Sequence, residues 1–185
     1  MNVILTHEQA DFDALAALLG AALLHDRSLP VLPRRLNRNV RNFLNLYSSE
    51  FSFVDARDLP ALPIESVTLV DTQSMVTQKG IHAKTKIKVI DHHPQRPDLN
   101  PEWTVHVDRV GSCTTLLVEE LRDHNGNLTV LQATLLLLGI YEDTGSLTYV
   151  STTSRDVRAA AYLLEQGASL QIAADYLNPP LSAEQ

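Results

Sequence analysis

The sequence predicts an α/β domain: a parallel, five-stranded, Rossmann-like sheet with helices on both faces. Three observations support this fold class. Short apolar segments rich in β-branched residues alternate with longer segments of helical spacing, which is the pattern of βαβ units. The chain has 185 residues, of which 44% are hydrophobic, so it can bury one sizeable core but not two ordinary ones. Several of the predicted strands also end directly in aspartate or histidine.

The first half of the chain alternates strands with helices. The predicted strands are Asn2–Leu5, Pro30–Leu32 and Phe51–Val54, and the predicted helices are Phe12–His25 and Asn39–Tyr47. The first helix is rich in alanine and leucine and follows Asp11, a residue type that caps helix N-termini. The second helix has apolar residues at helical spacing along one face. Pro60 and Pro63 then interrupt regular structure and predict a loop.

The second half of the chain places strands first and helices after them. The predicted strands are Ser66–Val70, Lys86–Ile90 and Trp103–Val107, and the predicted helices are Cys113–Asp123, Thr129–Tyr141, Ser154–Glu165 and Ser169–Tyr176. Gly167 is placed to end the third of these helices. Pro179, Pro180 and polar residues follow. We therefore expect the domain to cover residues 1–178, with residues 179–185 as a tail or a linker to a further C-terminal part.

Composition narrows the class of protein. The net charge of -7 and the pI of about 5.4 argue against a general nucleic-acid coat, although bound cations can create a phosphate site in an acidic chain. The single cysteine, Cys113, excludes an intrachain disulfide. No basic leader precedes an apolar stretch, and the longest apolar run, Leu135–Ile140, is far below the roughly 20 residues that cross a bilayer. We expect a cytoplasmic protein without membrane attachment.

Acidic and imidazole side chains gather where predicted strands end. His7, Asp71 and Asp91 each follow such a strand, and the carboxyl ends of parallel strands share one edge, where ligands bind. Taken singly, Asp11 is an ordinary N-cap, Asp13 an ordinary complement to a helix dipole, and Asp71 an ordinary strand-end residue. Gathered at one edge, they would repel one another unless cations lay between them. The full set is His7, Asp11, Asp13, Asp71, Asp91, His92, His93 and Asp143.

The mixture of carboxylates and imidazoles indicates the class of metal. Such ligands suit Mn²⁺, Fe²⁺, Co²⁺ or Zn²⁺, and the lack of cysteine ligands argues against a structural zinc site. Two ions roughly 3.5–4 Å apart lower the pKa of a shared water and stabilise in-line displacement at phosphorus. The residues therefore predict metal-assisted hydrolysis of a phosphate ester or anhydride.

Four motifs, in order along the chain, resemble those of the DHH phosphoesterase family. They are His7-Glu-Gln-Ala-Asp11-Phe-Asp13-Ala14, Val70-Asp71-Thr72, Asp91-His92-His93 and Tyr141-Glu-Asp143-Thr-Gly145-Ser146. An Asp-His-His triplet alone is a weak signal, whereas the four together are a strong one. The resemblance implies a sheet of about five parallel strands with helices on both faces, and hydrolysis of phosphodiesters or phosphoanhydrides. The first motif is also similar to that of bacterial proteins in which a DHH domain precedes CBS domains and a poly(A) polymerase or tRNA nucleotidyltransferase module.

The resemblance further implies a role for each residue. His7 and Asp11 bind one metal; Asp13, His92 and Asp143 bind the other; Asp71 bridges the two. His93 lies near the leaving group or the bridging water and acts as a general acid, and Asp91 orients the neighbouring imidazoles. The expected cofactors are two divalent metal ions, Mn²⁺ first, with Mg²⁺ and Co²⁺ as alternatives.

The chain departs from the family pattern in two places. Ala14-Leu15-Ala16 stands where Gly-Ser often follows the first motif, which alters packing but removes no ligand. No basic, glycine-rich second domain follows Gly145, so we expect either an excised domain that continues into further domains or a different substrate arm. The expected partner is a phosphorylated small molecule or a short oligonucleotide, with polyphosphate, pyrophosphate and cyclic dinucleotides all open. A homodimer is one option for the assembly.

Other polar residues have weaker functional readings. The arginines at 34, 35, 38 and 41 favour a solvated helix face over a substrate contact. Residues 111–115 lie at the start of a predicted helix, where backbone N–H groups can bind an anion. An anion site and an ordinary turn are equally compatible with this segment. Cys113 suits core packing rather than nucleophilic attack. Asp108 also follows a predicted strand, and a role in supporting the site residues stays open for it. No comparable set of carboxylates accompanies the remaining histidines, for which we expect surface or structural roles: His25, His82, His106 and His124.

Two other functions are compatible with the chain. One is a metal- or nucleotide-binding regulatory module without turnover, within a larger RNA-processing protein. The other is a receiver-like phosphoacceptor domain, which also places aspartates at strand ends. The second accounts neither for His7 nor for the His92-His93 pair, so hydrolysis and the regulatory module are the hypotheses that we carry forward.

Overall fold

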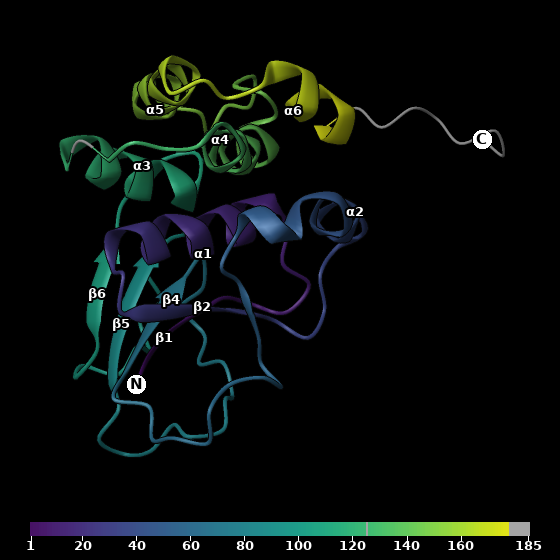
Figure 1. The fold of residues 1–185 in the computed structure, drawn as a ribbon. Helices are drawn as coiled ribbons and strands as arrows, with labels where there is room; N and C mark the ends of the chain where they lie inside the picture. Colours follow the sequence, from purple (N-terminus) through teal and green to yellow (C-terminus); the bar gives the residue numbers. More distant parts are fainter. Residues whose placement is uncertain (125, 178–185) are drawn as a thin grey trace, which may run out of the picture.

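The computed structural model describes residues 1–124 and 126–177. Six parallel strands form one sheet in the order β3-β2-β1-β4-β5-β6 (Figure 1). Their bounds are β1 Asn2–Leu5, β2 Ser28–Leu32, β3 Val54–Asp55, β4 Ser66–Val70, β5 Lys86–Asp91 and β6 Thr104–Val107. The parallel α/β class is confirmed, with six strands instead of five. All six apolar segments identified in the sequence join the sheet, and β3 at one edge pairs over only two residues with β2.

The helices follow the predicted segments closely. Their bounds are α1 Phe12–Leu24, α2 Arg38–Tyr47, α3 Cys113–Asp123, α4 Val130–Thr144, α5 Ser154–Glu165 and α6 Leu170–Leu177, with a short 3-10 helix at Ser48–Glu50. Helix α4 continues three residues past the predicted end and stops at Gly145, which has a left-handed φ of 55°. Asp143 consequently lies in the last turn of α4. The predicted boundary between residues 178 and 179 lies outside the described residues.

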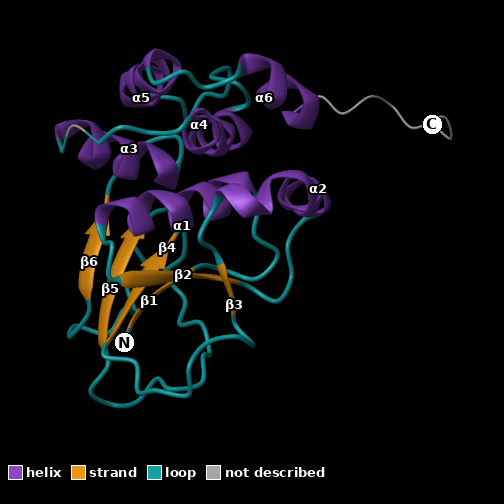
Figure 2. Ribbon diagram, in the orientation of Figure 1, coloured by secondary structure: helices purple, strands orange, loops and turns teal. Residues whose placement is uncertain are grey.

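Helices cover one face of the sheet, and loops cover the other (Figure 2). The expectation of helices on both faces is therefore wrong for the described residues. Right-handed crossovers that leave the sheet centre in opposite directions lie on opposite faces. The β1-to-β2 and β2-to-β3 crossovers contain α1 and α2, whereas the β4-to-β5 and β5-to-β6 crossovers on the other side contain no helix. Residues 92–103 carry three prolines, at positions 94, 97 and 101, which prevent a helix there.

Three buried clusters hold these layers together. Val3, Leu5 and Leu69 pack under the loop-covered face. Ile4 and Leu18 belong to the cluster between the sheet and helices α1 and α3. The third cluster joins α1 to the outer helices, and it contains the four consecutive leucines 135–138, all without solvent exposure. A helix can bury every side of a leucine run only when it is enclosed, and α4 lies between α1 and helices α5 and α6 (Figure 1).

Helices α1 and α4 approach closely because glycine occupies position 139. A Cβ atom there would lie 2.6 Å from Ala16 Cβ and 2.7 Å from Thr114 Oγ1, well inside van der Waals contact. The close approach brings the N-terminal end of α1 beside the C-terminal end of α4. Asp13 thereby comes near Asp143. No helix in the described part of the chain is long and apolar enough to cross a membrane.

Candidate metal centre

The predicted site residues meet where the strand order reverses. Strands β1 and β4 are neighbours in the sheet, but the chain leaves them in opposite directions along it. A crevice opens at such a switch point, beyond the carboxyl ends of the strands. His7 follows β1, Asp71 follows β4, and Asp91 ends β5 with His92 directly after it. The fold therefore converts strand-end positions in the sequence into one cluster.

Asp71 is at the centre of this cluster. Its Oδ2 lies 3.2 Å from His7 Nε2, and its Oδ1 lies 3.5 Å from His92 Nε2. The residue is 5% exposed and has a left-handed φ of 53°, a conformation that costs of order 1–3 kcal/mol outside glycine. Burial raises the pKa of this carboxyl, but the hydrogen bond with His7 and the nearby imidazole of His92 outweigh burial and lower it. The strained turn brings the carboxylate between the two imidazoles.

Two groups of three donor residues share this region. His7, Asp11 and Asp71 form one group, and Asp13, His92 and Asp143 form the other; the donor atoms of each group lie within 4.8 Å of one another. Asp71 connects the groups, because its second oxygen lies near His92 Nε2. The donor atoms therefore lie in the two sets that the family resemblance implies, and the binding of a metal by each set stays a prediction.

His7 and His92 are each oriented by a backbone carbonyl. The Nδ1 atom of His7 lies 2.9 Å from the Glu8 oxygen, and the Nδ1 atom of His92 lies 3.3 Å from the Val110 oxygen. Both rings therefore present Nε2 to the carboxylates. The hydrogen bond with Asp71 raises the pKa of His7 to about 9. Burial lowers the pKa of His92, but neighbouring carboxylates outweigh burial and raise it to about 11.

Asp13 is held by the start of helix α3. Its carboxylate accepts hydrogen bonds from Ser112 Oγ at 2.8 Å, Cys113 N at 2.8 Å and Thr114 N at 2.9 Å. A helix N-terminus stabilises negative charge. The anion that we considered for residues 111–115 is thus the side chain of Asp13, which has no solvent exposure. Burial, followed by the nearby Asp71 and Asp143, raises the pKa of Asp13 well above its usual value.

His93 and Asp91 form a hydrogen-bonded pair that joins the cluster, because their donor atoms and those of Asp71 and His92 form a third group within 4.8 Å of one another. Asp91 Oδ1 accepts from His93 Nδ1 at 2.8 Å, and Asp91 Oδ2 accepts from Gln73 Nε2 at 2.8 Å. Burial raises the pKa of Asp91, but the hydrogen bonds from His93 and Gln73 outweigh it and lower the pKa. The ring of His93 is 57% exposed. An imidazole fixed on its buried side and open on the other can exchange a proton with a molecule in the crevice.

The donor set fits divalent cations. Asp71 Oδ1 and His92 Nε2 are buried and have no hydrogen-bond partner in the described part of the chain, and a buried polar atom without a partner is costly. Each lies among other donors at ion-pair distances: His92 Nε2 is 3.3 Å from Asp143, 3.5 Å from Asp71 and 3.7 Å from Asp13. Oxygen and imidazole nitrogen donors at this density suit Mn²⁺, Co²⁺ or Zn²⁺.

Comparison with known proteins agrees with this geometry. Residues 2–140 match the family described as "DHH family, N-terminal domain". The chain belongs to the DHH family. It is similar to an A-adding tRNA nucleotidyltransferase of Geobacter sulfurreducens, with 37% identity over 193 residues, which cover all of this chain and 22% of that protein. It is also similar to the bifunctional oligoribonuclease and PAP phosphatase NrnA of Mycoplasma genitalium, with 28% identity over 95% of this chain and 56% of that protein.

A solved structure shares the fold of this DHH chain. An exopolyphosphatase-related protein of Bacteroides fragilis superposes with a TM-score of 0.74 at 16% identity, over 98% of this chain and 57% of that chain. At this identity the likeness concerns the fold alone. The chain spans 22% of the Geobacter relative, so most of that protein has no counterpart here.

Sequence reasoning missed three residues that support the centre. Asp156 is fully buried and accepts hydrogen bonds from Gly111 N, from Thr115 Oγ1 and from the backbone and hydroxyl of Thr153. It thereby fastens the segment that carries Val110 and holds Asp13. A signal for Asp156 was present, because it is the third residue after a threonine N-cap.

The second and third missed residues are Gln73 and Glu142. Gln73 connects Asp91 with the backbone of Arg96, which donates to Gln73 Oε1 at 2.8 Å. Glu142 accepts a hydrogen bond from Phe12 N and lies beside Asp11 and Asp143. Burial raises the pKa of Glu142 to about 7. Glu142 lies within the fourth motif, but the motif assigned it no role, and Gln73 has no sequence signal, since both residues act through contacts with distant segments.

Three other residues singled out in the sequence have defined contacts in the structure. Asp11 is the N-cap of α1, accepting from Ala14 N at 3.0 Å, and also lies in the cluster, so both readings hold. Cys113 is fully buried and donates to the Ile90 oxygen, as expected for a packing residue. The Asp108 carboxylate pairs with Arg155 and belongs to none of the donor groups among the described residues.

Proposed function

We propose that this chain is the catalytic domain of a metal-dependent phosphoesterase, which hydrolyses a phosphodiester or phosphoanhydride bond with two divalent cations, Mn²⁺ being the best match. The observation that carries the proposal is the pair of donor groups that meet at Asp71, together with its buried, unpartnered Oδ1 atom. Mg²⁺ and Co²⁺ are alternatives for the same ligands.

The two donor groups suggest which residues would hold each ion. His7 and Asp11 would hold one ion, Asp13, His92 and Asp143 the other, and Asp71 both. Bound ions would lower the pKa of a water and offset negative charge on the phosphoryl group. The chain itself contributes fixed ligands: the Val110 carbonyl orients His92, and the start of α3 orients Asp13.

His93 is the proposed general acid. Its hydrogen bond with Asp91 raises the pKa of the imidazole, which favours the protonated form that a general acid needs. Its exposed edge faces solvent and can give that proton to the leaving oxygen. Asp91 keeps the ring oriented and stabilises its charged form.

Relatives indicate the class of substrate. NrnA is named as an oligoribonuclease and PAP phosphatase, and a cyclic-di-AMP phosphodiesterase GdpP of Geobacillus thermodenitrificans is 28% identical over 90% of this chain. Both names describe phosphorus–oxygen bonds in nucleotides. We therefore propose a phosphorylated small molecule or a short oligonucleotide as the substrate, and further domains in the native chain. The homodimer and the cytoplasmic location stay predictions.

Hydrolysis of bis-p-nitrophenyl phosphate tests the activity. The chain with Mn²⁺ is expected to release p-nitrophenol, and Asp71→Asn is expected to abolish release. Asp108→Asn is the matched control, since it removes the same charge from another strand end outside the cluster. Full activity in the presence of a strong chelator, or in Asp71→Asn, would contradict the metal mechanism.

The second candidate is a metal- or nucleotide-binding regulatory module without turnover. The A-adding tRNA nucleotidyltransferase relative, of which the chain spans 22%, favours it. This candidate predicts that metal and nucleotide raise the melting temperature without product formation. A turnover of roughly 1 s⁻¹ or more would exclude it.

A further inference from the structure

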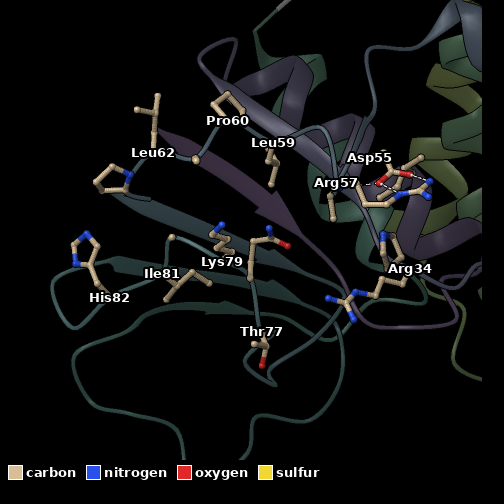
Figure 3. A pocket seen from close by; sticks show the side chains of 17 residues that line it. Arg34, Asp55, Arg57, Leu59, Pro60, Leu62, Thr77, Lys79, Ile81 and His82 are labelled. Atoms are coloured by element: carbon tan, nitrogen blue, oxygen red, sulfur yellow. Dashed lines mark hydrogen bonds and ion pairs between the residues drawn. The ribbon is translucent and has the colours of Figure 1, made fainter.

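A large groove lies on the loop-covered face of the sheet (Figure 3). Its walls are residues 55–63 on one side and residues 77–82 on the other, and Leu32, Pro33 and Arg34 close one end at the carboxyl edge of β2. No proposed metal ligand lines it in the described part of the chain. Its volume of about 1240 Å³ exceeds the roughly 300–1,000 Å³ of a usual small-molecule pocket. The size favours an extended ligand.

The two walls of the groove are fastened to each other. Ile64 N donates to the Gly80 oxygen at 2.9 Å. Gly80 has a φ of +102°, and a Cβ atom there would lie 2.8 Å from the Leu62 oxygen. Only glycine accommodates both this conformation and this close approach. The groove is therefore a built feature of the loop-covered face.

The groove carries positive charge on an acidic chain. Arg34 and Lys79 are exposed, and neither forms an ion pair with any residue that the structure describes. Arg57 is different, because its guanidinium makes two hydrogen bonds to Asp55, at 2.7 and 3.0 Å. In Figure 3, Arg34 lies near the Asp55–Arg57 pair, and Lys79 lies farther along the groove. The whole chain has a net charge of -7, whereas the groove lining carries Arg34, Arg57 and Lys79 against the single carboxylate of Asp55 and is therefore locally positive.

Apolar surface separates the cations. Leu59, Pro60 and Ile81 line the groove between and around them (Figure 3). A single strand of nucleic acid has the matching pattern, since phosphates carry charge at intervals and the bases offer apolar faces. An acidic peptide would satisfy the cations but would leave the apolar lining exposed to charged side chains.

The Arg34 end of the groove is joined to the metal centre. Arg35 N donates to Glu8 Oε2 at 3.1 Å, and Gln9 N donates to the Arg35 oxygen at 2.9 Å. The segment that begins at Arg34 thus runs along the loop between His7 and Asp11. A strand whose phosphate reached the metal centre could continue past this loop into the groove.

We propose that the groove binds the nucleotides of a single-stranded oligonucleotide that extend away from the bond to be cleaved. This inference rests on the proposed hydrolysis, but binding in the groove is measurable without it. Arg34 and Lys79 contact phosphates, and the apolar lining contacts bases. The described residues of the lining include no phenylalanine, tyrosine or tryptophan, so the phosphate contacts carry most of the binding, which depends strongly on salt.

Fluorescence anisotropy of a labelled hexanucleotide, with metal removed by chelator, tests the binding. The expected result for Arg34→Gln/Lys79→Gln is weaker binding and a plot of log affinity against log salt that is flatter by about 1.4, since each contact with single-stranded nucleic acid contributes about 0.7 to the slope. Arg27→Gln/Arg158→Gln is the matched control: it removes two exposed cations that lie outside the groove lining and is expected to keep the wild-type slope.

A second measurement separates this inference from the proposed hydrolysis. With Mn²⁺, the groove variant is expected to raise KM for a hexanucleotide by a larger factor than KM for bis-p-nitrophenyl phosphate. If the groove variant and the control gave equal slopes of log affinity against log salt, the proposed binding in the groove would be wrong, even for an active enzyme. If the chain bound the hexanucleotide through Arg34 and Lys79 but did not hydrolyse it, the proposed hydrolysis would be wrong and the proposed binding in the groove would hold. Tighter binding of a polyglutamate peptide than of the hexanucleotide would also overturn the proposed occupant.

Discussion

Replacing Asp156 by alanine should destabilise the fold and loosen the metal centre together. The carboxylate accepts from Gly111 N at 3.0 Å and from Thr153 N at 2.7 Å, and it is fully buried. Alanine leaves both N–H groups without this acceptor, at about 1–3 kcal/mol each. The bond from Thr153 N is also the part of the capping box at the start of α5 that Asp156 supplies, so it is counted once. The expected loss is about 4 kcal/mol, which corresponds to a lower melting temperature by about 8–16 °C for a chain of this size.

Urea unfolding of metal-free protein, followed by circular dichroism, measures this loss. Asp156→Asn keeps one acceptor oxygen and should lose less stability than Asp156→Ala, while Asp123→Ala, at an exposed position on α3, should stay within about 0.5 kcal/mol of wild type. Calorimetric titration of the folded variant should show Mn²⁺ affinity reduced about 10–100-fold, because support of a ligand is lost. A stability loss below about 1 kcal/mol, or an unchanged Mn²⁺ affinity, would refute the reasoning.

Four further predictions concern helix packing, metal binding, proton release and the pH dependence of stability. Gly139→Ala places a Cβ 2.6 Å from Ala16 Cβ, so urea unfolding should show a loss of about 1–3 kcal/mol; an unchanged midpoint would mean that α4 shifts freely. Mn²⁺ at about 100 times its Kd should stabilise the chain by about 2.7 kcal/mol in thermal unfolding, and Asp71→Asn should lack most of this gain. The pKa values of about 9 for His7 and about 11 for His92 mean that both rings are protonated at neutral pH without metal. Mn²⁺ binding should therefore release about two protons, measured by calorimetry in buffers of different ionisation enthalpy; no buffer dependence would contradict it. Since the folded pKa of His7 exceeds its usual 6.5, its contribution to metal-free stability is complete below that pH and is lost as pH rises through about 9.

Local pattern was sufficient for most elements and for the composition of the centre. Strand β1 and helices α3 and α5 have the predicted bounds, because β-branched runs and helical spacing are properties of neighbouring residues. His7, Asp71 and His92 were predictable as a cluster, since a parallel sheet places its strand ends at one edge. Asp11 was predictable as a cap for the same local reason.

Features that depend on distant partners were not predictable in this way. Which face each crossover covers depends on the strand order, and irregular segments, including the proline-rich stretch 92–103, replaced the helices expected on the second face. The groove required residues 55–63 and 77–82 to lie side by side. The anion held by α3 is Asp13, about a hundred residues earlier in the chain.

The sequence by itself determined which chemical groups the protein places at the edge of its sheet, because side-chain identity and strand periodicity are local. The tertiary structure alone decided which of those groups are fixed by hydrogen bonds and which residues form these bonds. Asp156 fastens a segment 45 residues away, and Gln73 reaches Asp91 across the crossover. Such contacts arise only when packing brings separate segments within hydrogen-bond distance, and no spacing rule along the chain encodes them.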